Sequence, residues 1–171
     1  MTPDDLAMPV DAETALAGSP PGHKDELRLW LRLLTCTNLI EAEIRRRLRL
    51  AFDTTLPRFD LLAQLQRSPA GLTLGEVSRR MMVSNGNVTG LASRLEQEGL
   101  IERRTSATDR RAQTLRLTPR GRREVARQTA AHEGWVAELL GGLSAPERAA
   151  LHHLLGRTKA SVRTGLQESQ P

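Results

Sequence analysis

The sequence predicts a mainly α-helical protein with one short β-hairpin, and three observations support this fold class. Apolar residues recur at helical spacing over most of the chain beyond residue 23, whereas they alternate with polar residues between positions 100 and 118. Residue types that cap helices precede several of the helical stretches. The 171 residues are 39% hydrophobic, which suffices for one domain with a core of Leu, Ala and Val, because Phe and Trp together number four and Tyr is absent.

Residues 1–23 are predicted to be a disordered acidic arm. They contain four acidic residues, four prolines, no Lys or Arg and no apolar period. An acidic start is unlike a secretory signal, and charged residues interrupt the most apolar stretch, so we expect a cytoplasmic protein that makes no use of a membrane. The single cysteine excludes a disulfide framework and a cysteine-rich metal site.

Two helices are predicted to follow the arm. The first, over 24–52, carries one apolar stripe and two outward ion pairs at i, i+4 spacing, Glu41–Arg45 and Glu43–Arg47. Nearly thirty residues is long for a helix in so small a protein, so part of its stripe is expected to pack on another subunit. The second helix has Pro57 among its first residues and extends to about residue 67.

Residues 73–98 are predicted to form two short helices joined by a tight turn. Thr73 and Glu76 have the spacing of a capping box for the first, which ends near Met81, and Ser84 is the cap of the second. Gly99 is placed to end the pair. The positions expected to be buried are Leu74, Val77, Met81, Val88, Leu91, Ala92 and Leu95.

The outer face of the second helix consists of small polar residues, which are poor helix formers. Such side chains let a helix approach the major groove closely and bond to base edges, whereas a solvated face favours Glu, Lys and Arg. The pair is therefore interpreted as a helix-turn-helix; the alternative is an irregular surface helix. The face comprises Ser84, Asn85, Asn87, Thr89, Gly90, Ser93 and Arg94.

The alternating segment after Gly99 is predicted to be a hairpin, with strands over 100–104 and 112–118 and a polar turn between them. Directly behind a recognition helix, such a hairpin is the wing of a winged helix-turn-helix. Arg110 and Arg111 lie at its tip, where Asp109 is expected to orient one guanidinium for insertion into the minor groove. The alternative is a plain hairpin with solvated arginines.

Positive charge is concentrated around these elements. Residues 79–123 hold eleven arginines against four acidic residues, although the whole chain has a net charge of only +5. Concentrated Arg is typical of proteins that bind a phosphate backbone, while many charge runs are merely solvated faces, so charge alone leaves both interpretations open.

Two further helices complete the prediction. Thr118 and Pro119 begin the first, which extends to about Leu140, and Ser144 with Glu147 forms a second capping box for a helix ending near Thr164. The apolar side of the first is expected to contain Val125, Thr129, His132, Val136 and Leu139.

Together these residues resemble the MarR-type (multiple antibiotic resistance regulator) family. The specific part is Asp109-x-Arg111-x-x-x-Leu115-x-Leu117-Thr118, followed by Pro119 and Gly121 and preceded by the sequence from Gly99 to Arg103. The similarity covers roughly 25–165. It implies a homodimer whose first and last two helices interlock, which binds palindromic double-stranded operators, commonly represses and is released by a small ligand.

The resemblance divides the chain into regions. It implies a helical dimerisation region over 24–56 and 119–165, a winged helix-turn-helix domain over 57–118 and a tail over 166–171. The recognition helix is then 84–98 and the wing 103–113, which adds Arg103 to the DNA-binding residues. The segment 83–90 resembles a subgroup that regulates aromatic-acid catabolism, some members of which respond to acyl-CoA thioesters.

An effector site is implied between the dimer helices and the winged domain. Structural core is the alternative for each apolar candidate, and Arg58 has the choice of an anionic ligand or a surface carboxylate. The candidates are Trp30, Leu33, Thr37, Arg58, Phe59, His132 and Trp135.

Other chemistries are less favoured. The chain has no phosphate-binding loop, metalloprotease motif or nucleophile elbow, so we predict that it is not an enzyme. The histidines lack metal-ligand spacing, and we expect no metal and no cofactor. Cys36 is expected to be a buried, inert cysteine rather than a thiol redox sensor. An architectural DNA binder without a ligand and a helical scaffold with solvated arginines remain as alternatives.

Overall fold

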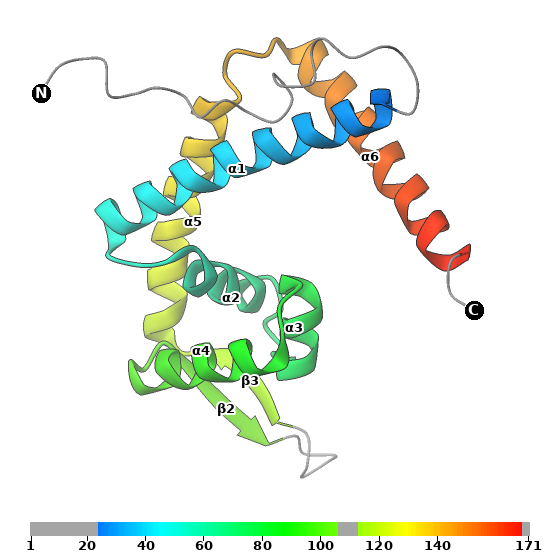
Figure 1. Cartoon of the computed structure of the whole chain (residues 1–171). Helices are drawn as coiled ribbons and strands as arrows, with labels where there is room; N and C mark the ends of the chain where they lie inside the picture. Colours follow the sequence, from blue (N-terminus) through cyan, green and yellow to red (C-terminus); the bar gives the residue numbers. More distant parts are fainter. Residues whose placement is uncertain (1–23, 106–112, 169–171) are drawn as a thin grey trace, which may run out of the picture. The chain divides into compact units, whose positions relative to one another are not determined.

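The computed structural model describes residues 24–105 and 113–168 (Figure 1). The chain divides into two compact units, 1–130 and 131–171. The predicted acidic arm, the tip of the predicted hairpin and the last three residues lie outside the described residues.

The first unit contains most of the secondary structure, in the predicted order. The helices are α1 (Lys24–Phe52), α2 (Leu56–Gln66), α3 (Leu74–Met81), α4 (Asn85–Gln97) and the start of α5 (Pro119–Leu139); the strands are β1 (Leu72–Thr73), β2 (Ile101–Thr105) and β3 (Gln113–Leu117). Each predicted helix of this unit and both hairpin strands are confirmed to within one or two residues.

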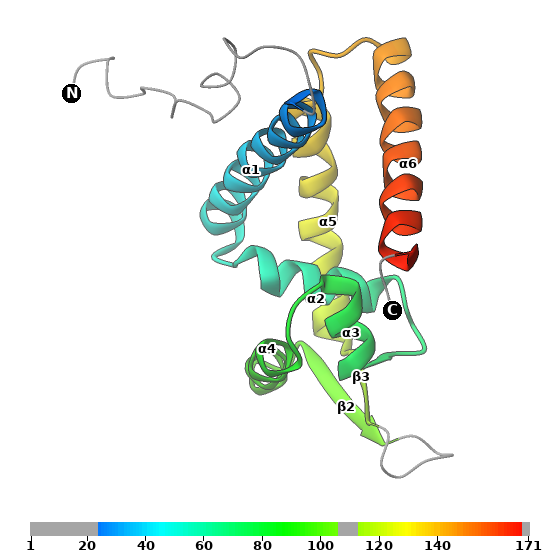
Figure 2. The ribbon, with the colours of Figure 1, turned by 45° about the vertical axis from the view of Figure 1, so that its right-hand side comes forward.

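The sheet has three antiparallel strands in the order β1-β3-β2, one more than the predicted hairpin. Leu72 of β1 pairs with Leu115, and Ile101 of β2 pairs with Leu117. Figure 2 shows β2 and β3 side by side, with α4 seen nearly along its axis. A strand of two residues is too short to show alternation in the sequence, which is why β1 was not predicted.

The core lies between α2, α3, α4 and the inner face of the sheet. Its fully buried side chains include Leu48, Leu61, Leu62, Leu65, Val77, Val88, Leu95, Ile101, Leu115 and Val125. Three expectations were wrong, because Leu74, Met81 and Leu91 are only half-buried. Leu74 and Met81 lie at the two ends of an eight-residue helix, where few neighbours cover them, so Val77 in its middle is the only buried residue of α3.

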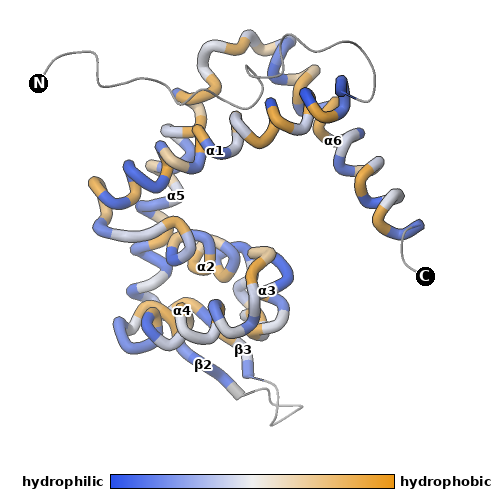
Figure 3. The backbone as a smooth tube through the Cα atoms, in the orientation of Figure 1, coloured by the Kyte–Doolittle hydropathy of each residue, from blue (hydrophilic) through white to orange (hydrophobic). Residues whose placement is uncertain are grey.

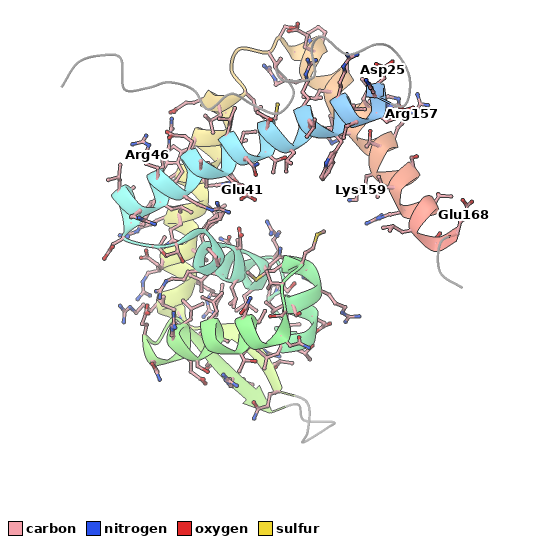
Figure 4. All side chains as sticks on the ribbon, in the orientation of Figure 1. Asp25, Glu41, Arg46, Arg157, Lys159 and Glu168 are labelled. Atoms are coloured by element: carbon pink, nitrogen blue, oxygen red, sulfur yellow. The ribbon has the colours of Figure 1, made fainter. Side chains whose placement is uncertain are left out.

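Helix α1 buries only Ile44 and Leu48, both near its C-terminal end. The two predicted ion pairs are present, and Figure 4 shows Glu41 and Arg46 projecting from different sides of the helix. Hydrogen bonds from Arg46 and then Arg47 lower the pKa of Glu43 to about 2.

The prediction for Cys36 was wrong, because its side chain is exposed. The neighbouring Leu34 is also exposed, and no residue in the N-terminal half of α1 is buried. An apolar helix stripe shows which side chains share a face, but does not reveal whether the same subunit covers that face.

The second unit contains the end of α5 and α6 (Ala145–Glu168). The predicted capping box is present: Ser144 N–H donates to Glu147 Oε2 at 2.7 Å, and Glu147 N–H donates to Ser144 Oγ at 3.4 Å. Helix α6 extends past its predicted end near Thr164 and buries none of its residues. Hydrophobic and hydrophilic residues alternate along it in Figure 3. Within the described residues, no helix is both long and apolar enough to span a membrane.

Candidate nucleic-acid interface

Helices α3 and α4 form the predicted pair, each begun by a side-chain cap. Thr73 Oγ1 accepts from Glu76 N–H at 3.2 Å while Glu76 Oε2 accepts from Thr73 N–H at 2.7 Å, which is the predicted capping box. Ser84 Oγ accepts from Asn87 N–H at 3.4 Å. Between the helices Met82 has a φ of 55°, a left-handed conformation that produces the tight turn.

Burial divides α4 into two faces. Val88, Ala92 and Leu95 are each 0% exposed, so they anchor the helix to the core and fix its rotation. Because residues three and four apart share a helix face, the side chains on the opposite face point outward. The predicted contact residues that are exposed are Ser84, Asn85, Asn87, Thr89, Gly90 and Arg94, while Ser93 is half-buried.

The exposed face is shallow and rich in hydrogen-bonding groups. A Cβ at Gly86 or Gly90 would meet nothing within 4 Å, so the backbone there is open to close approach. Thr89 Oγ1 donates to Asn85 O at 2.8 Å, which leaves the hydroxyl oxygen free to accept a bond. A cavity of about 450 Å³ beside this face is lined by residues of α4 and of the start of α2.

Arg103 and Ser93, both predicted to contact DNA, bond to each other. Arg103 Nη2 donates to Ser93 Oγ at 2.9 Å, and its Nε donates to Glu96 Oε2 at the same distance. In the structure Arg103 therefore ties β2 to α4 and holds the hairpin against the recognition helix.

A second ion pair, for which the sequence did not identify the acidic residue, joins α2 to the end of α4. Arg58 Nη1 donates to Glu98 Oε1 at 2.7 Å, and its Nη2 bonds to the second oxygen. This pair lowers the pKa of Glu98 and raises that of Arg58. Arg120 of α5 adds a bond to the Glu98 carbonyl at 2.9 Å. Of the two predicted partners for Arg58, the structure shows the surface carboxylate. Arg58 and Glu98 are forty residues apart, so no local spacing in the sequence could identify Glu98 as that carboxylate.

The other candidate effector residues are divided between the units. In the first unit Phe59 belongs to the core at 4% exposure, whereas Trp30 is 57% exposed. Leu33 is half-buried, and its carbonyl accepts from the hydroxyl of the exposed Thr37 at 2.8 Å. In the second unit His132 and Trp135 are half-buried, and burial lowers the pKa of His132.

The predicted wing tip, Asp109, Arg110 and Arg111, lies outside the described residues. Strands β2 and β3 lead to it, and Arg104 pairs with Thr114 near their open ends. Around the helix pair the described residues add exposed positive charge at Arg79 and Arg80. In the part of the chain that is described, no three His, Cys, Asp or Glu side chains group as a metal site would need.

Comparison with known proteins identifies the family. A MarR family model matches residues 52–112, from the end of α1 to the hairpin. The transcriptional activatory protein BadR of Rhodopseudomonas palustris is 32% identical over 133 residues, which cover 75% of each chain.

Solved structures agree with this assignment. A MarR family transcriptional regulator from Silicibacter pomeroyi matches 86% of this chain and 97% of its own, with a TM-score of 0.63 and 30% identity. A mutant MarR from E. coli complexed with operator DNA shares the fold, with a TM-score of 0.70 and 21% identity over 81% of this chain and 99% of its own. These proteins are transcriptional regulators rather than enzymes, in agreement with the sequence prediction. The chain belongs to the MarR family of DNA-binding transcriptional regulators.

Proposed function

We propose that the chain is a ligand-responsive regulator that binds a palindromic operator as a homodimer. The observation that carries the proposal is the division of α4, in which Val88, Ala92 and Leu95 are fully buried while the opposite face offers small polar side chains. A helix with fixed rotation and a shallow polar face fits the major groove. Each subunit is proposed to place this face in a major groove, with half-sites about one turn, ~10 base pairs, apart.

The proposed DNA contacts differ in what they recognise. Asn85, Asn87, Thr89 and Arg94 are exposed and available to base edges or phosphates. Arg110 and Arg111 at the wing tip are proposed to enter the minor groove, oriented by Asp109. Ser93 and Arg103, which bond to each other, are proposed to position the hairpin.

Exposed apolar surface supports a homodimer. Helix α6 buries nothing within the chain, and monomeric proteins rarely leave so many large apolar side chains on two helices uncovered. A dimer is checked by the molar mass of the protein in solution. The exposed residues are Leu27, Leu29, Trp30, Leu34, Leu39 and Leu50 on α1 and Leu151, Leu154, Leu155, Val162 and Leu166 on α6.

The effector is proposed to be an aromatic acid or its CoA thioester. The candidate contact residues are Trp30, Leu33 and Thr37 in the first unit and, taken separately, His132 and Trp135 in the second unit. Support comes from the resemblance of residues 83–90 to regulators of aromatic-acid catabolism and from the exposure of Trp30.

The effect of operator binding on transcription has two candidate outcomes. Repression by occupying the operator is the first. The similarity to BadR, a transcriptional activatory protein, favours activation as the second candidate outcome. Exposure of Cys36 keeps a thiol-based response as an alternative, tested by oxidising wild type and Cys36→Ser.

A gel-shift titration with the DNA upstream of the protein's own gene tests the docking. Arg111→Ala should weaken binding to all sequences and lower the slope of log affinity against log salt by about 1, because one phosphate-region contact is lost. Asn87→Ala should instead cost about 1–3 kcal/mol at particular base pairs. Arg163→Ala, an exposed arginine of α6, is the matched charge control and should leave both quantities unchanged.

Three outcomes count against the proposal. If operator affinity is unchanged in both Arg111→Ala and Asn87→Ala, the proposed placement of α4 and the wing on DNA is wrong. If Arg163→Ala weakens binding as much as Arg111→Ala does, the effect of Arg111 is only one of general charge. Selective binding that no aromatic acid, CoA thioester or oxidant releases would identify an architectural DNA binder.

A further inference from the structure

A cluster of arginines lies on the face of the sheet that points away from α4. Glu102 of β2 pairs with Arg116 of β3, and Arg104 lies two positions along the same strand as Glu102, so all three share one face. Arg103, on the opposite face, bonds to Ser93 of α4. The cluster is therefore distinct from the polar face of the recognition helix.

These side chains line a cavity of about 400 Å³ within the first unit. That volume lies in the range of roughly 300–1,000 Å³ that is typical of small-molecule sites. Leu65 and Leu117, both buried, and the rings of Pro69 and Pro119 give the cavity apolar walls. Arg122, from the first turn of α5, contributes a third guanidinium.

Among the described residues, no hydrogen bond is made by the buried Nε of Arg116, which lines the cavity. A Cβ at Gly71, where φ is +93°, would come within 2.8 Å of Arg116 Cγ and 3.2 Å of its Nε, so only glycine leaves room for this side chain. The Nε is buried and makes no hydrogen bond, and within residues 24–105 and 113–168 the guanidinium forms no ion pair. Glu102, its cross-strand neighbour, bonds instead to Arg104 Nε at 2.7 Å. A buried donor that no protein group satisfies is unfavourable unless water or a ligand bonds to it, and a ligand with acceptor oxygens would do so here.

The start of α5 strengthens the positive potential. The N-terminus of a helix carries a partial positive charge and favours acidic residues, yet the first turn of α5 contains none. It contains Arg120 and Arg122 instead. Arg122 Nη1 donates to Leu117 O at 2.9 Å, which fixes its guanidinium beside the cavity.

The charge and shape indicate the class of ligand. Three guanidinium groups against the single carboxylate of Glu102 leave two positive charges. A phosphate monoester carries about −1.5 to −2 at pH 7, and its three oxygens accept bonds from planar guanidinium forks. The volume beyond one phosphate leaves room for a small organic body against the apolar walls. We propose that this cavity binds a small phosphate monoester, with Arg116, Arg122 and Arg104 as its phosphate ligands.

Calorimetric titration of phenyl phosphate into the full chain, without DNA, tests the site. We expect saturable binding, and at least a tenfold loss of affinity in Arg116→Gln, because charge-assisted hydrogen bonds to the phosphate are lost. The matched control is Arg123→Gln. Arg123 is exposed, lies next to Arg122 on α5 and does not line the cavity, so this variant should bind phenyl phosphate like the wild type. Benzoate, with a similar ring but a single charge, should bind more weakly. Thermal unfolding verifies that each variant is folded, and Arg122→Gln replaces Arg116→Gln if the latter is not.

Several results would overturn this assignment. Absence of saturable binding to wild type does so, as does an equal loss in Arg116→Gln and Arg123→Gln. A titration with duplex DNA can also overturn it. If Arg116→Gln lowers DNA affinity and the slope of log affinity against log salt while phenyl phosphate affinity is unchanged, the arginine cluster binds the DNA backbone instead. Since the calorimetric titration uses no DNA, its result tests the phosphate site independently of the proposed operator binding.

Discussion

A single methyl group added at Gly121 is expected to lower the free energy of unfolding strongly. Gly121 lies in the first turn of α5, where alanine normally stabilises a helix by about 0.5–1 kcal/mol over glycine. A Cβ at this site, however, would stand 1.9 Å from the carbonyl oxygen of Leu100 and 2.9 Å from its carbon, whereas ordinary contact begins at 3.4 Å. Gly121→Ala therefore requires the backbones of α5 and the start of β2 to separate by about 1.5 Å.

The surrounding bonds oppose that separation. The Leu100 carbonyl accepts from Thr118 N–H at 3.0 Å, and Thr118 Oγ1 accepts from Gly121 N–H at the same distance. Thr118 is therefore bonded both to Leu100 and to Gly121. Separating Leu100 from Gly121 breaks one of these two hydrogen bonds at the start of α5. Overpacking against backbone costs roughly 1–3 kcal/mol, and a lost cap adds about 1, so we expect about 2–4 kcal/mol of destabilisation.

Urea denaturation followed by circular dichroism measures this cost. With a slope of about 2 kcal/mol per molar, a loss of 3 kcal/mol lowers the unfolding midpoint by about 1.5 M. Gly134→Ala in the same helix is the control, because a Cβ there meets nothing within 4 Å, and it should not lower stability. Equal midpoints for wild type and Gly121→Ala would refute the claim that the contact between Leu100 and α5 requires glycine.

Two other predictions concern the fixation of the helix pair. Thr73→Ala removes one half of the capping box of α3 and should cost about 1 kcal/mol in urea denaturation, whereas Thr73→Ser should retain most of the stability; equal losses would show that the cap contributes little. Glu98→Gln should cost at most about 1 kcal/mol at pH 7, because the Glu98 side chain of the ion pair with Arg58 is 43% exposed. Since Arg58 lowers the pKa of Glu98, the stabilisation is present above the ordinary pKa of about 4.3 and is lost as pH falls through the lowered pKa. The difference in stability between wild type and Glu98→Gln should therefore shrink on going from pH 7 to pH 3, and a difference that grows would contradict the pairing.

The sequence by itself determined the local structure of this protein. Caps at Thr73, Ser84 and Ser144 act within three residues of their partners, so their spacing predicts where α3, α4 and α6 begin. Periodicity likewise predicted the buried side of α4 and the inward Leu115 and Leu117 of β3. With α4 the sequence also indicated the polar face that is the proposed DNA contact surface.

Only the tertiary structure decided which distant groups meet. It paired Arg58 with Glu98, tied Arg103 to Ser93, added β1 to the sheet and left Cys36 exposed. It also brought Arg104 and Arg116 on neighbouring strands together with Arg122 on α5 around one cavity. The physical reason is range: caps and helical periods depend on residues within a turn or two, whereas ion pairs and cavities depend on how whole elements pack.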